Sequence, residues 1–157
     1  MPSLVGSEMC IRDRGRGMEY KRQGNTVIVR VDKGEDIIKE LLGLSEKENI
    51  LFASVSGLGA VNDIELGIFD TSEKRYNSKR FTGDFEITSL VGTLSRKDKK
   101  PYIHVHMSVG NVITNEFVGG HLNKAIVGAT AEIVLNVVDV VVEREFVEEI
   151  GLNLFKF

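Results

Sequence analysis

The chain has 157 residues, of which 42% are hydrophobic and 27% are charged, and its formal net charge is −3. This length fits one domain, and the composition excludes a disordered chain, a collagen-like repeat and a disulfide-rich scaffold. The slight acidity disfavours a protein that grips phosphates, without excluding one. The single cysteine, Cys10, cannot form an internal disulfide and fits a reducing compartment, so we expect a cytoplasmic protein.

The sequence indicates no membrane segment. A helix that spans a bilayer needs roughly 20 apolar residues, and the longest candidate, residues 133–142, is interrupted by Asn136 and Asp139. The apolar run at the start of the chain is only Leu4-Val5, too short for the region of about 7–15 residues in a signal peptide. We therefore expect no membrane contact and no export.

The first 17 residues show neither the period of a strand nor that of a helix, so we expect residues 1–17 to be an unstructured leader and residues 18–157 to be the domain. Residues 3–14 resemble a translated sequencing adapter, and Met18 is a natural restart, which leaves open whether the leader is native. Without the leader, 17 basic and 21 acidic residues remain, and the domain has a net charge of −4.

The domain begins with one strand and one helix. Alternating valines predict a strand over residues 27–31. Residues 35–48 then show apolar side chains at helical spacing, and this pattern predicts an amphipathic helix with acidic residues in its first turn. The apolar positions of this helix are Ile37, Ile38, Leu41, Leu42 and Leu44.

From residue 50 onward the pattern indicates strands almost throughout. We expect strands over residues 50–56, 64–70, 85–94, 102–109 and 131–142, and a short helical turn and a final strand within residues 146–157. A charged run that ends in Pro101 predicts a hairpin loop at residues 95–101. Because residues 131–142 are apolar on both faces, we expect a central strand covered by the helix on one side and by another element or a neighbouring subunit on the other. This order indicates an α+β fold, with one amphipathic helix packed on a largely antiparallel sheet.

All three histidines of the chain, His104, His106 and His121, lie within 18 residues. Strand side chains alternate, so His104 and His106 share one face, with their bases about 6–7 Å apart. Two glycines before His121 let the chain turn sharply and present a third imidazole. Zinc suits neutral imidazole ligands, and three of them leave a fourth position for water or an acidic ligand. The same histidines could instead be ordinary polar residues on a wet strand face and in a loop.

Other chemistry-bearing residues are weaker candidates. Glu86 and Glu132 could serve as a fourth ligand or a base, or could simply face solvent. Residues 56–62, SGLGAVN, lack the third glycine of a dinucleotide loop and no helix pattern follows, so we interpret them as a turn or bulge between strands. Ser108 lies on the histidine face without an identifiable orienting acid, which leaves nucleophilic catalysis without support.

Five blocks follow one another along the chain: SGLGAV at residues 56–61, GDFEITSLVG at 83–92, HVH at 104–106, VGGHL at 118–122 and ATAEIVL at 129–135. Together they resemble the plant and prokaryote conserved domain, called the PPC domain, from residue 18 to about residue 154. VGGHL is the most specific block. The resemblance implies an α+β fold that assembles as a homotrimer, with a metal, expected to be zinc, on His104, His106 and His121.

The resemblance also implies a role. Stand-alone prokaryotic members are commonly labelled predicted DNA-binding proteins, and plant members join the domain to AT-hook segments that contact the minor groove. Two features depart from that pattern. Asp84 stands where a plant-type block has arginine, so contacts attributed to that arginine do not carry over. The run RGRG at residues 14–17 has glycine where an AT-hook core has proline.

We therefore expect a zinc-binding, homotrimeric PPC-domain protein of the prokaryotic cytoplasm. It would act as a DNA-binding module or as a regulatory module, and a regulatory module would bind a protein partner. Two alternatives stay open: a zinc-dependent enzyme in which a three-histidine ion activates water, and a purely structural oligomeric interaction module. Basic residues gather at 74–75, 79–80 and 96–100; such runs are most often solvated hairpin tips, but threefold assembly could join them into one patch.

Overall fold

The computed structural model describes residues 17–157. Residues 1–16, and with them nearly all of the expected leader, lie outside the described residues. The described chain contains one helix, α2 (Ile37–Lys47), and eight strands: β1 (Glu19–Gln23), β2 (Thr26–Asp32), β3 (Ala53–Asp70), β4 (Arg75–Lys97), β5 (Lys100–Asn111), β6 (Glu116–Val137), β7 (Glu143–Val147) and β8 (Leu152–Lys156). The predicted α+β class is confirmed.

One antiparallel sheet dominates the fold. Its strand order is β1-β2-β6-β3-β4-β5, and β5 pairs in addition with the start of β6. This second pairing is open to β6 because the strand is 22 residues long: its first part lies beside β5 and its last part beside β2. The sheet therefore curls, and its edge strand β5 comes back to the first part of β6.

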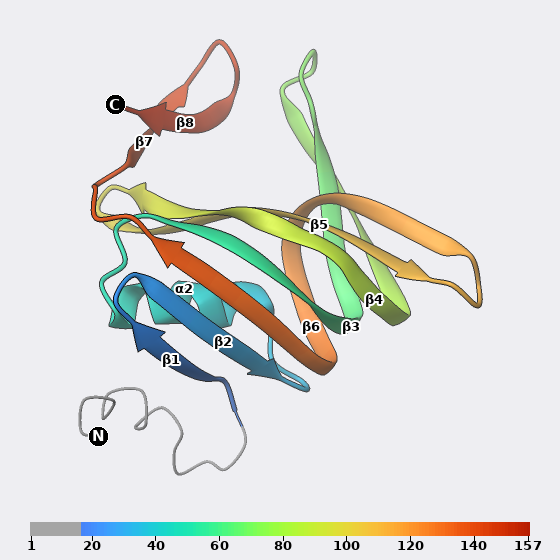
Figure 1. Ribbon diagram of the computed structural model, residues 1–157. Coiled ribbons are helices and arrows are strands. Elements are labelled where there is room, and N and C mark those ends of the chain that lie inside the picture. The colour runs from blue at the N-terminus through green and yellow to red at the C-terminus, as the bar shows by residue number, and fades with distance from the viewer. Residues whose placement is uncertain (1–16) are drawn as a thin grey trace.

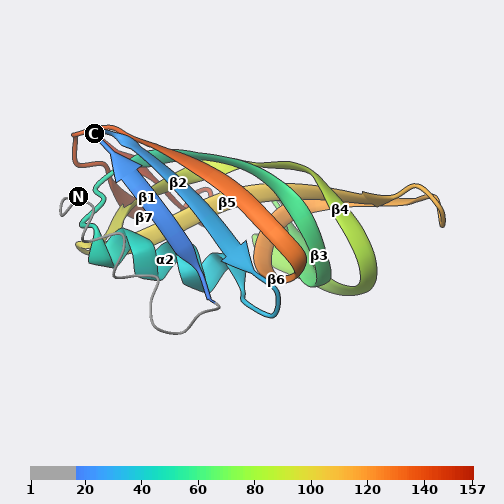
Figure 2. The same ribbon diagram turned by 60° about the horizontal axis from the view of Figure 1, so that its bottom comes forward.

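Helix α2 covers one face of the sheet, and the other face carries two hairpins (Figures 1 and 2). Ile37, Leu41 and Leu44 are fully buried, as the apolar spacing predicted. The carboxylate of Asp36 caps the helix by accepting a hydrogen bond from Ile38 N at 3.1 Å, and it accepts another from Ala125 N of β6 at 3.1 Å. The N-cap thus fixes the helix to the sheet as well as starting it. No helix within residues 17–157 is long and apolar enough to cross a membrane.

Two predicted strands are one. Residues 50–56 and 64–70 were expected as separate strands, but β3 runs from Ala53 to Asp70 without a break. The glycine-bearing block between them is a bulge, because the pairing with β4 shifts register between Gly57 and Gly59 and again between Val61 and Asp63. A bulge bends a strand without ending it, and the sequence signal of a bulge resembles that of a turn.

The strand expected at residues 131–142 is the last part of a longer strand, since β6 begins at Glu116 and ends at Val137, five residues before the predicted end. Its inner residues Ala131, Ile133 and Leu135 are fully buried, as expected of a central strand. Its other face, with Glu132 and Asn136, is exposed in this chain, so no element within residues 17–157 supplies the expected second cover.

The hairpin loop predicted at residues 95–101 is tighter than expected, because the ladder of β4 and β5 leaves only Asp98 and Lys99 in the turn. Both have positive φ, at 54° and 66°. The final segment forms a separate two-stranded sheet, the β7–β8 hairpin, in which a turn replaces the expected helical turn. The predicted final strand is confirmed as β8.

The β7–β8 hairpin stands on the helix-free face, where the far halves of β3 and β4 also rise from the sheet as a long arm (Figure 1). These two features meet: Lys74 Nζ at the tip of the arm donates a hydrogen bond to the carbonyl of Glu148 at 3.2 Å. The turn of the β7–β8 hairpin therefore rests against the tip of the β3–β4 arm. The helix-free face of the sheet is therefore bordered by the β3–β4 arm on one side and by the β7–β8 hairpin on another.

Candidate metal centre

The structure brings His104, His106 and His121 together. One ligand nitrogen from each lies within 4.8 Å of the others, and the ring centroids are 5.2, 5.2 and 5.7 Å apart. His104 and His106 project from β5, and His121 comes from the facing part of β6, where it is the register partner of His106. The fold therefore brings the three imidazoles together, as the sequence predicted.

Strand alternation holds the first two imidazoles on one face. Val105 and Met107, which alternate with the histidines on β5, are 1% and 2% exposed and belong to the core. A slip of one residue in the register of β5 would bury both histidines and expose both apolar side chains, and this penalty fixes the strand. His104 and His106 consequently point away from α2.

The two glycines before His121 act differently from the prediction. They were expected to make a sharp turn, but Gly119 and Gly120 lie within β6. A Cβ on Gly120 would lie 2.7 Å from the carbonyl oxygen of Gly67 on β3. Glycine is needed here because the backbones of β3 and β6 approach closely, and that approach brings His121 to the other two rings.

Burial and mutual repulsion keep two of the imidazoles neutral. Burial, followed by the positive charges of His121, Arg144 and His106, lowers the pKa of His104 to about 4. Burial, followed by the charge of His106, also lowers the pKa of His121. A neutral imidazole has a nitrogen lone pair free to bind a metal, so near pH 7 these two residues are in the ligand form.

The donor set fits a zinc ion, because zinc binds neutral imidazole nitrogen and a site with three protein ligands keeps one position open. No acidic side chain of residues 17–157 belongs to the cluster. Glu86 and Glu132, the two candidates for a fourth ligand, are both exposed. Glu86 pairs with Gly110 at the far end of β5, and Glu132 lies opposite Arg30 and Leu58. The structure does not bring them to the histidines.

Two aromatic side chains that the sequence analysis missed border the site. The ring of Tyr76, from the β3–β4 arm, meets that of His121 edge to face with centroids 5.5 Å apart. Its hydroxyl donates a hydrogen bond to Asn123 Oδ1. On the other side, Tyr102 precedes His104 by two residues on the same face of β5 and stacks against Arg144. Neither tyrosine carries a sequence signal that separates it from an ordinary strand residue.

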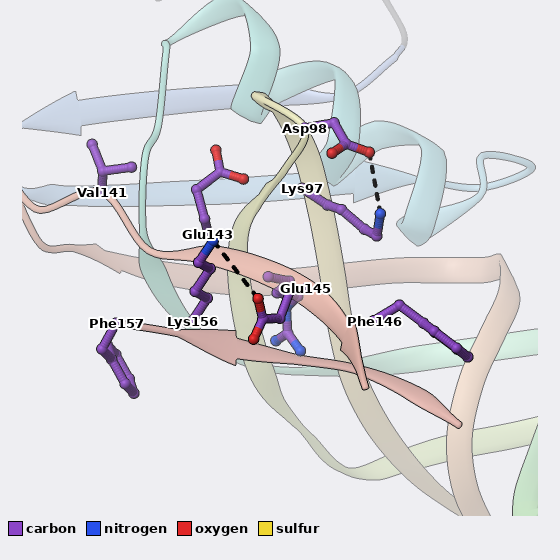
Figure 3. A pocket seen from close by; sticks show the side chains of 9 residues that line it. Lys97, Asp98, Val141, Glu143, Glu145, Phe146, Lys156 and Phe157 are labelled. Carbon is purple, nitrogen blue, oxygen red and sulfur yellow. Dashed lines mark hydrogen bonds and ion pairs between the residues drawn. The ribbon is translucent and has the colours of Figure 1, made fainter. Parts of the chain in front are cut away.

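The cavity beside the β7–β8 hairpin does not contain the histidine cluster. It has a volume of about 540 Å³ and is bordered by the hairpin and the β4–β5 turn (Figure 3). No histidine lines it. Its exposed charges form pairs, Lys97 with Asp98 at 3.1 Å and Lys156 with Glu145 at 3.7 Å. The histidine cluster is thus a site on the sheet face, separate from this cavity.

Comparison with known proteins agrees with this fold. The chain matches the family model of the Plants and Prokaryotes Conserved (PCC) domain over residues 18–139. A search of curated proteins gave no match. The chain belongs to the Plants and Prokaryotes Conserved domain family, the PPC family that the sequence blocks resembled.

Several solved structures are similar over almost their whole length. A metal-containing protein from Archaeoglobus fulgidus is 34% identical, with a TM-score of 0.79, over 90% of this chain and 99% of that one. A protein from Bacteroides thetaiotaomicron, named as a candidate DNA-binding protein, is 30% identical, with a TM-score of 0.86, over 90% and 99%. A PPC protein from Pyrococcus horikoshii is 30% identical, with a TM-score of 0.77, over 89% and 94%.

A glycine behind the cluster yields a first prediction. Gly92 of β4 packs against β5 so closely that a Cβ would lie 2.1 Å from the carbonyl oxygen of His104. Gly92→Ala must therefore push the strand that carries His104 and His106, and we expect it to lower the free energy of unfolding by about 1–3 kcal/mol, as overpacking does. Urea unfolding of the purified protein measures this change.

Gly43→Ala is the matched control, because Gly43 lies on the exposed side of α2 and a Cβ there meets nothing within 4 Å. Alanine is the better helix former, so this variant should gain about 0.5–1 kcal/mol. Equal stability of the two variants would show that β4 and β5 are not as close at Gly92 as the structure has them.

Proposed function

We propose that residues 18–157 form a zinc-binding, homotrimeric PPC-domain module of the prokaryotic cytoplasm that binds DNA or regulates a partner protein. The observation that carries the proposal is the group of three imidazole nitrogens within 4.8 Å of one another. With one cysteine in 157 residues, the composition fits a reducing compartment. The name of the Archaeoglobus fulgidus relative, a metal-containing protein, supports the metal.

The ligands we propose for the ion are His104, His106 and His121. A zinc ion there would act as a Lewis acid toward whatever molecule fills the remaining position. The residues of the chain supply the rest: β5 and β6 orient the imidazoles, and burial keeps His104 and His121 unprotonated. An enzyme would in addition need a base beside the ion. Since Glu86 and Glu132 lie outside the cluster, we favour a binding module over the zinc-dependent enzyme.

Metal analysis tests the centre directly. Protein purified without chelators should contain about one zinc per chain, measured by inductively coupled plasma mass spectrometry. His104→Ala and His121→Ala should each weaken zinc binding by more than the roughly 10–100-fold that loss of an outer-shell partner costs. Glu86→Gln and Glu132→Gln should retain zinc. Metal-free wild-type protein that also fails to take up added zinc would refute the centre.

The helix-free face supports self-association. Apolar side chains on neighbouring strands of this face are exposed: Ile28 by 59%, Leu58 by 55% and Val91 by 52%. Strand register places Ile28, Val134, Ser56, Val91 and His106 in one row across the sheet. We call Ile28, Leu58 and Val91 with this row the apolar strip; exposed apolar side chains grouped in this way mark a protein contact. Because the strip ends at the histidine cluster, a second copy packed on it would lie next to the proposed centre.

Charge substitution tests the oligomer. We expect wild-type protein to sediment as three chains, and Val91→Asp to sediment as one, because a buried unpaired carboxylate in each interface costs several kcal/mol. Ile150→Asp introduces the same charge at a residue that is 45% exposed in the β7–β8 turn, and it should remain trimeric. A wild-type monomer at micromolar concentration in analytical ultracentrifugation would overturn this part of the proposal.

DNA binding has two supports, the name of the Bacteroides thetaiotaomicron relative and the basic pairs of the β3–β4 arm. Within the arm, Arg80 forms an ion pair with Asp63 at 2.8 Å, and Lys74 is bonded to the hairpin turn. Arg75 and Lys79 are exposed, with the ammonium of Lys79 lying 5.2 Å above the ring of Phe81. These two side chains are therefore the first candidates for phosphate contacts.

Fluorescence anisotropy with a labelled duplex at several salt concentrations measures those contacts. The logarithm of affinity should fall linearly with the logarithm of salt concentration, with a slope of about 0.9 per phosphate contact. The double variant Arg75→Ala/Lys79→Ala should reduce the slope by about 2, whereas Lys33→Ala/Lys39→Ala beside and on α2 should leave it unchanged. Wild-type protein without salt-dependent binding would exclude the DNA role and leave the regulatory one.

A further inference from the structure

Arg144 of β7 is a buried cation on the same face as the histidines. Arg144 is only 8% exposed. Its guanidinium lies between two aromatic rings, 4.7 Å from the centroid of Tyr102 and 4.4 Å from that of Phe155. Nε donates to Ser95 Oγ at 2.9 Å and Nη1 donates to the carbonyl oxygen of Asn153 at 2.9 Å. These contacts fix the guanidinium plane, and no acceptor within residues 17–157 takes a hydrogen bond from Nη2.

No carboxylate within residues 17–157 forms an ion pair with Arg144. Removing a charge from water costs several kcal/mol unless partners replace the lost hydration, and burial accordingly lowers the pKa of Arg144. Two rings and two neutral acceptors compensate only part of that cost. Among the described residues, the positive charge of Arg144 therefore has no ion-pair partner.

The other buried arginine shows what a purely structural role looks like. Arg96 is 6% exposed, and its Nε and Nη2 both donate to the carbonyl oxygen of Ile50, at 3.1 and 2.8 Å. Its Nη1 donates to the carbonyl oxygen of Lys99 at 3.2 Å. All three guanidinium nitrogens of Arg96 donate hydrogen bonds, and they join the loop at Ile50 to the β4–β5 turn at Lys99. Arg144 differs because one edge of its fork is free.

Arg144 lies close to the histidine cluster, and it also lines the cavity beside the β7–β8 hairpin. Ser95 and Tyr102, which Arg144 contacts, are register partners on β4 and β5, and the next row on the same face is Thr93 and His104. Adjacent rows on one strand face are about 7 Å apart. Consistent with this proximity, the charge of Arg144 contributes to the lowered pKa of His104. A small molecule can therefore contact the metal position and the guanidinium together.

We propose that Arg144 is the anion-recognition residue of the metal centre, and that the ligand of the open metal position is a small molecule bearing a carboxylate or a phosphate. This inference rests on the proposed metal centre and goes beyond it by naming the class of ligand. One oxygen of such an oxyanion binds the ion, and another accepts a hydrogen bond from Nη2, whose planar fork suits both groups. The anion also relieves the repulsion between the guanidinium and the cation.

The surrounding hairpins set the size of the ligand. Tyr76 of the β3–β4 arm borders the cluster on the side of His121, and Arg144 of the β7–β8 hairpin borders it on the side of His104. The arm and the hairpin touch where Lys74 Nζ donates to the carbonyl of Glu148. The space over the imidazoles is consequently bounded by both features. This arrangement favours a small oxyanion over the backbone of a polymer.

Cobalt substitution makes the site visible without an activity assay. Wild-type protein loaded with Co²⁺ is titrated with acetate in one arm and with inorganic phosphate in the other, at constant ionic strength, and the visible absorption of the ion reports occupancy of its open position. We expect a saturable spectral change in at least one arm. In Arg144→Gln the dissociation constant of that anion should rise about tenfold or more, equivalent to about 1.4 kcal/mol.

Three further variants make the result specific. Arg144→Lys keeps the charge but loses the planar fork, so its affinity should lie between those of wild-type protein and Arg144→Gln. If the glutamine variant fails to fold, as judged by thermal unfolding, the lysine variant carries the test, and its dissociation constant should rise measurably above that of the wild type. Lys156→Gln removes one charge from the same hairpin, at the ion pair with Glu145, and should bind the anion as the wild type does. His104→Ala should lose the cobalt spectrum itself.

The failures of the two proposals are distinguishable. If wild-type protein binds cobalt but no anion changes its spectrum, or if the anion binds Arg144→Gln and Arg144→Lys as tightly as it binds the wild type, the role of Arg144 is refuted and the metal centre stands. If wild-type protein does not bind cobalt at all, the metal centre is refuted, and the anion site, which depends on it, is refuted with it.

Discussion

The pairing of β5 with the start of β6 is the interaction on which the rest of the site depends. It brings His121 into register with His106, across a turn, and places both beside His104. The pairing exists because β6 is long enough to serve two neighbours and because Gly120 lets its backbone approach β3. Without this curl in the sheet, His104 and His106 would be two imidazoles on an open strand face with no third ligand.

The electrostatics of the site follow from its position on the sheet. His104 and His121 are partly buried, so their neutral form is favoured, most strongly at His104. A further positive charge, Arg144, is held nearby by two aromatic rings. A site that gathers neutral donors next to an unbalanced cation is suited to a metal ion together with an anion, because each reduces the cost of the other.

The two faces of the sheet differ in composition: one carries the hydrophobic core, and the other carries exposed apolar side chains and the histidines. The face under α2 contains the fully buried residues Ile37, Leu41, Ile133 and Leu135 and provides most of the hydrophobic stabilisation. The opposite face carries the histidines, the apolar strip of Ile28, Leu58 and Val91, and both hairpins. Our proposals place the metal, its ligand and a second copy of the chain on this helix-free face.

Much of this could be predicted from the sequence, because it depends on neighbours along the chain. Apolar spacing predicted α2, alternation predicted that His104 and His106 share a face, and the ordered blocks predicted the family. The continuity of β3 was missed, because a bulge and a turn use the same residues. The role of Gly119 and Gly120 was also misread, since close backbone approach involves a strand about 50 residues away.

What the sequence determined by itself was the identity of the donors and the direction of two of them, since strand alternation is a local property. The tertiary structure decided that His121 joins the pair and that Glu86 and Glu132 do not. It also decided that Arg144 is buried with no ion-paired acid among residues 17–157. Each of these depends on which distant segments pair in the folded sheet. Long-range pairing is set by the balance of burial over the whole core, and no local pattern encodes it.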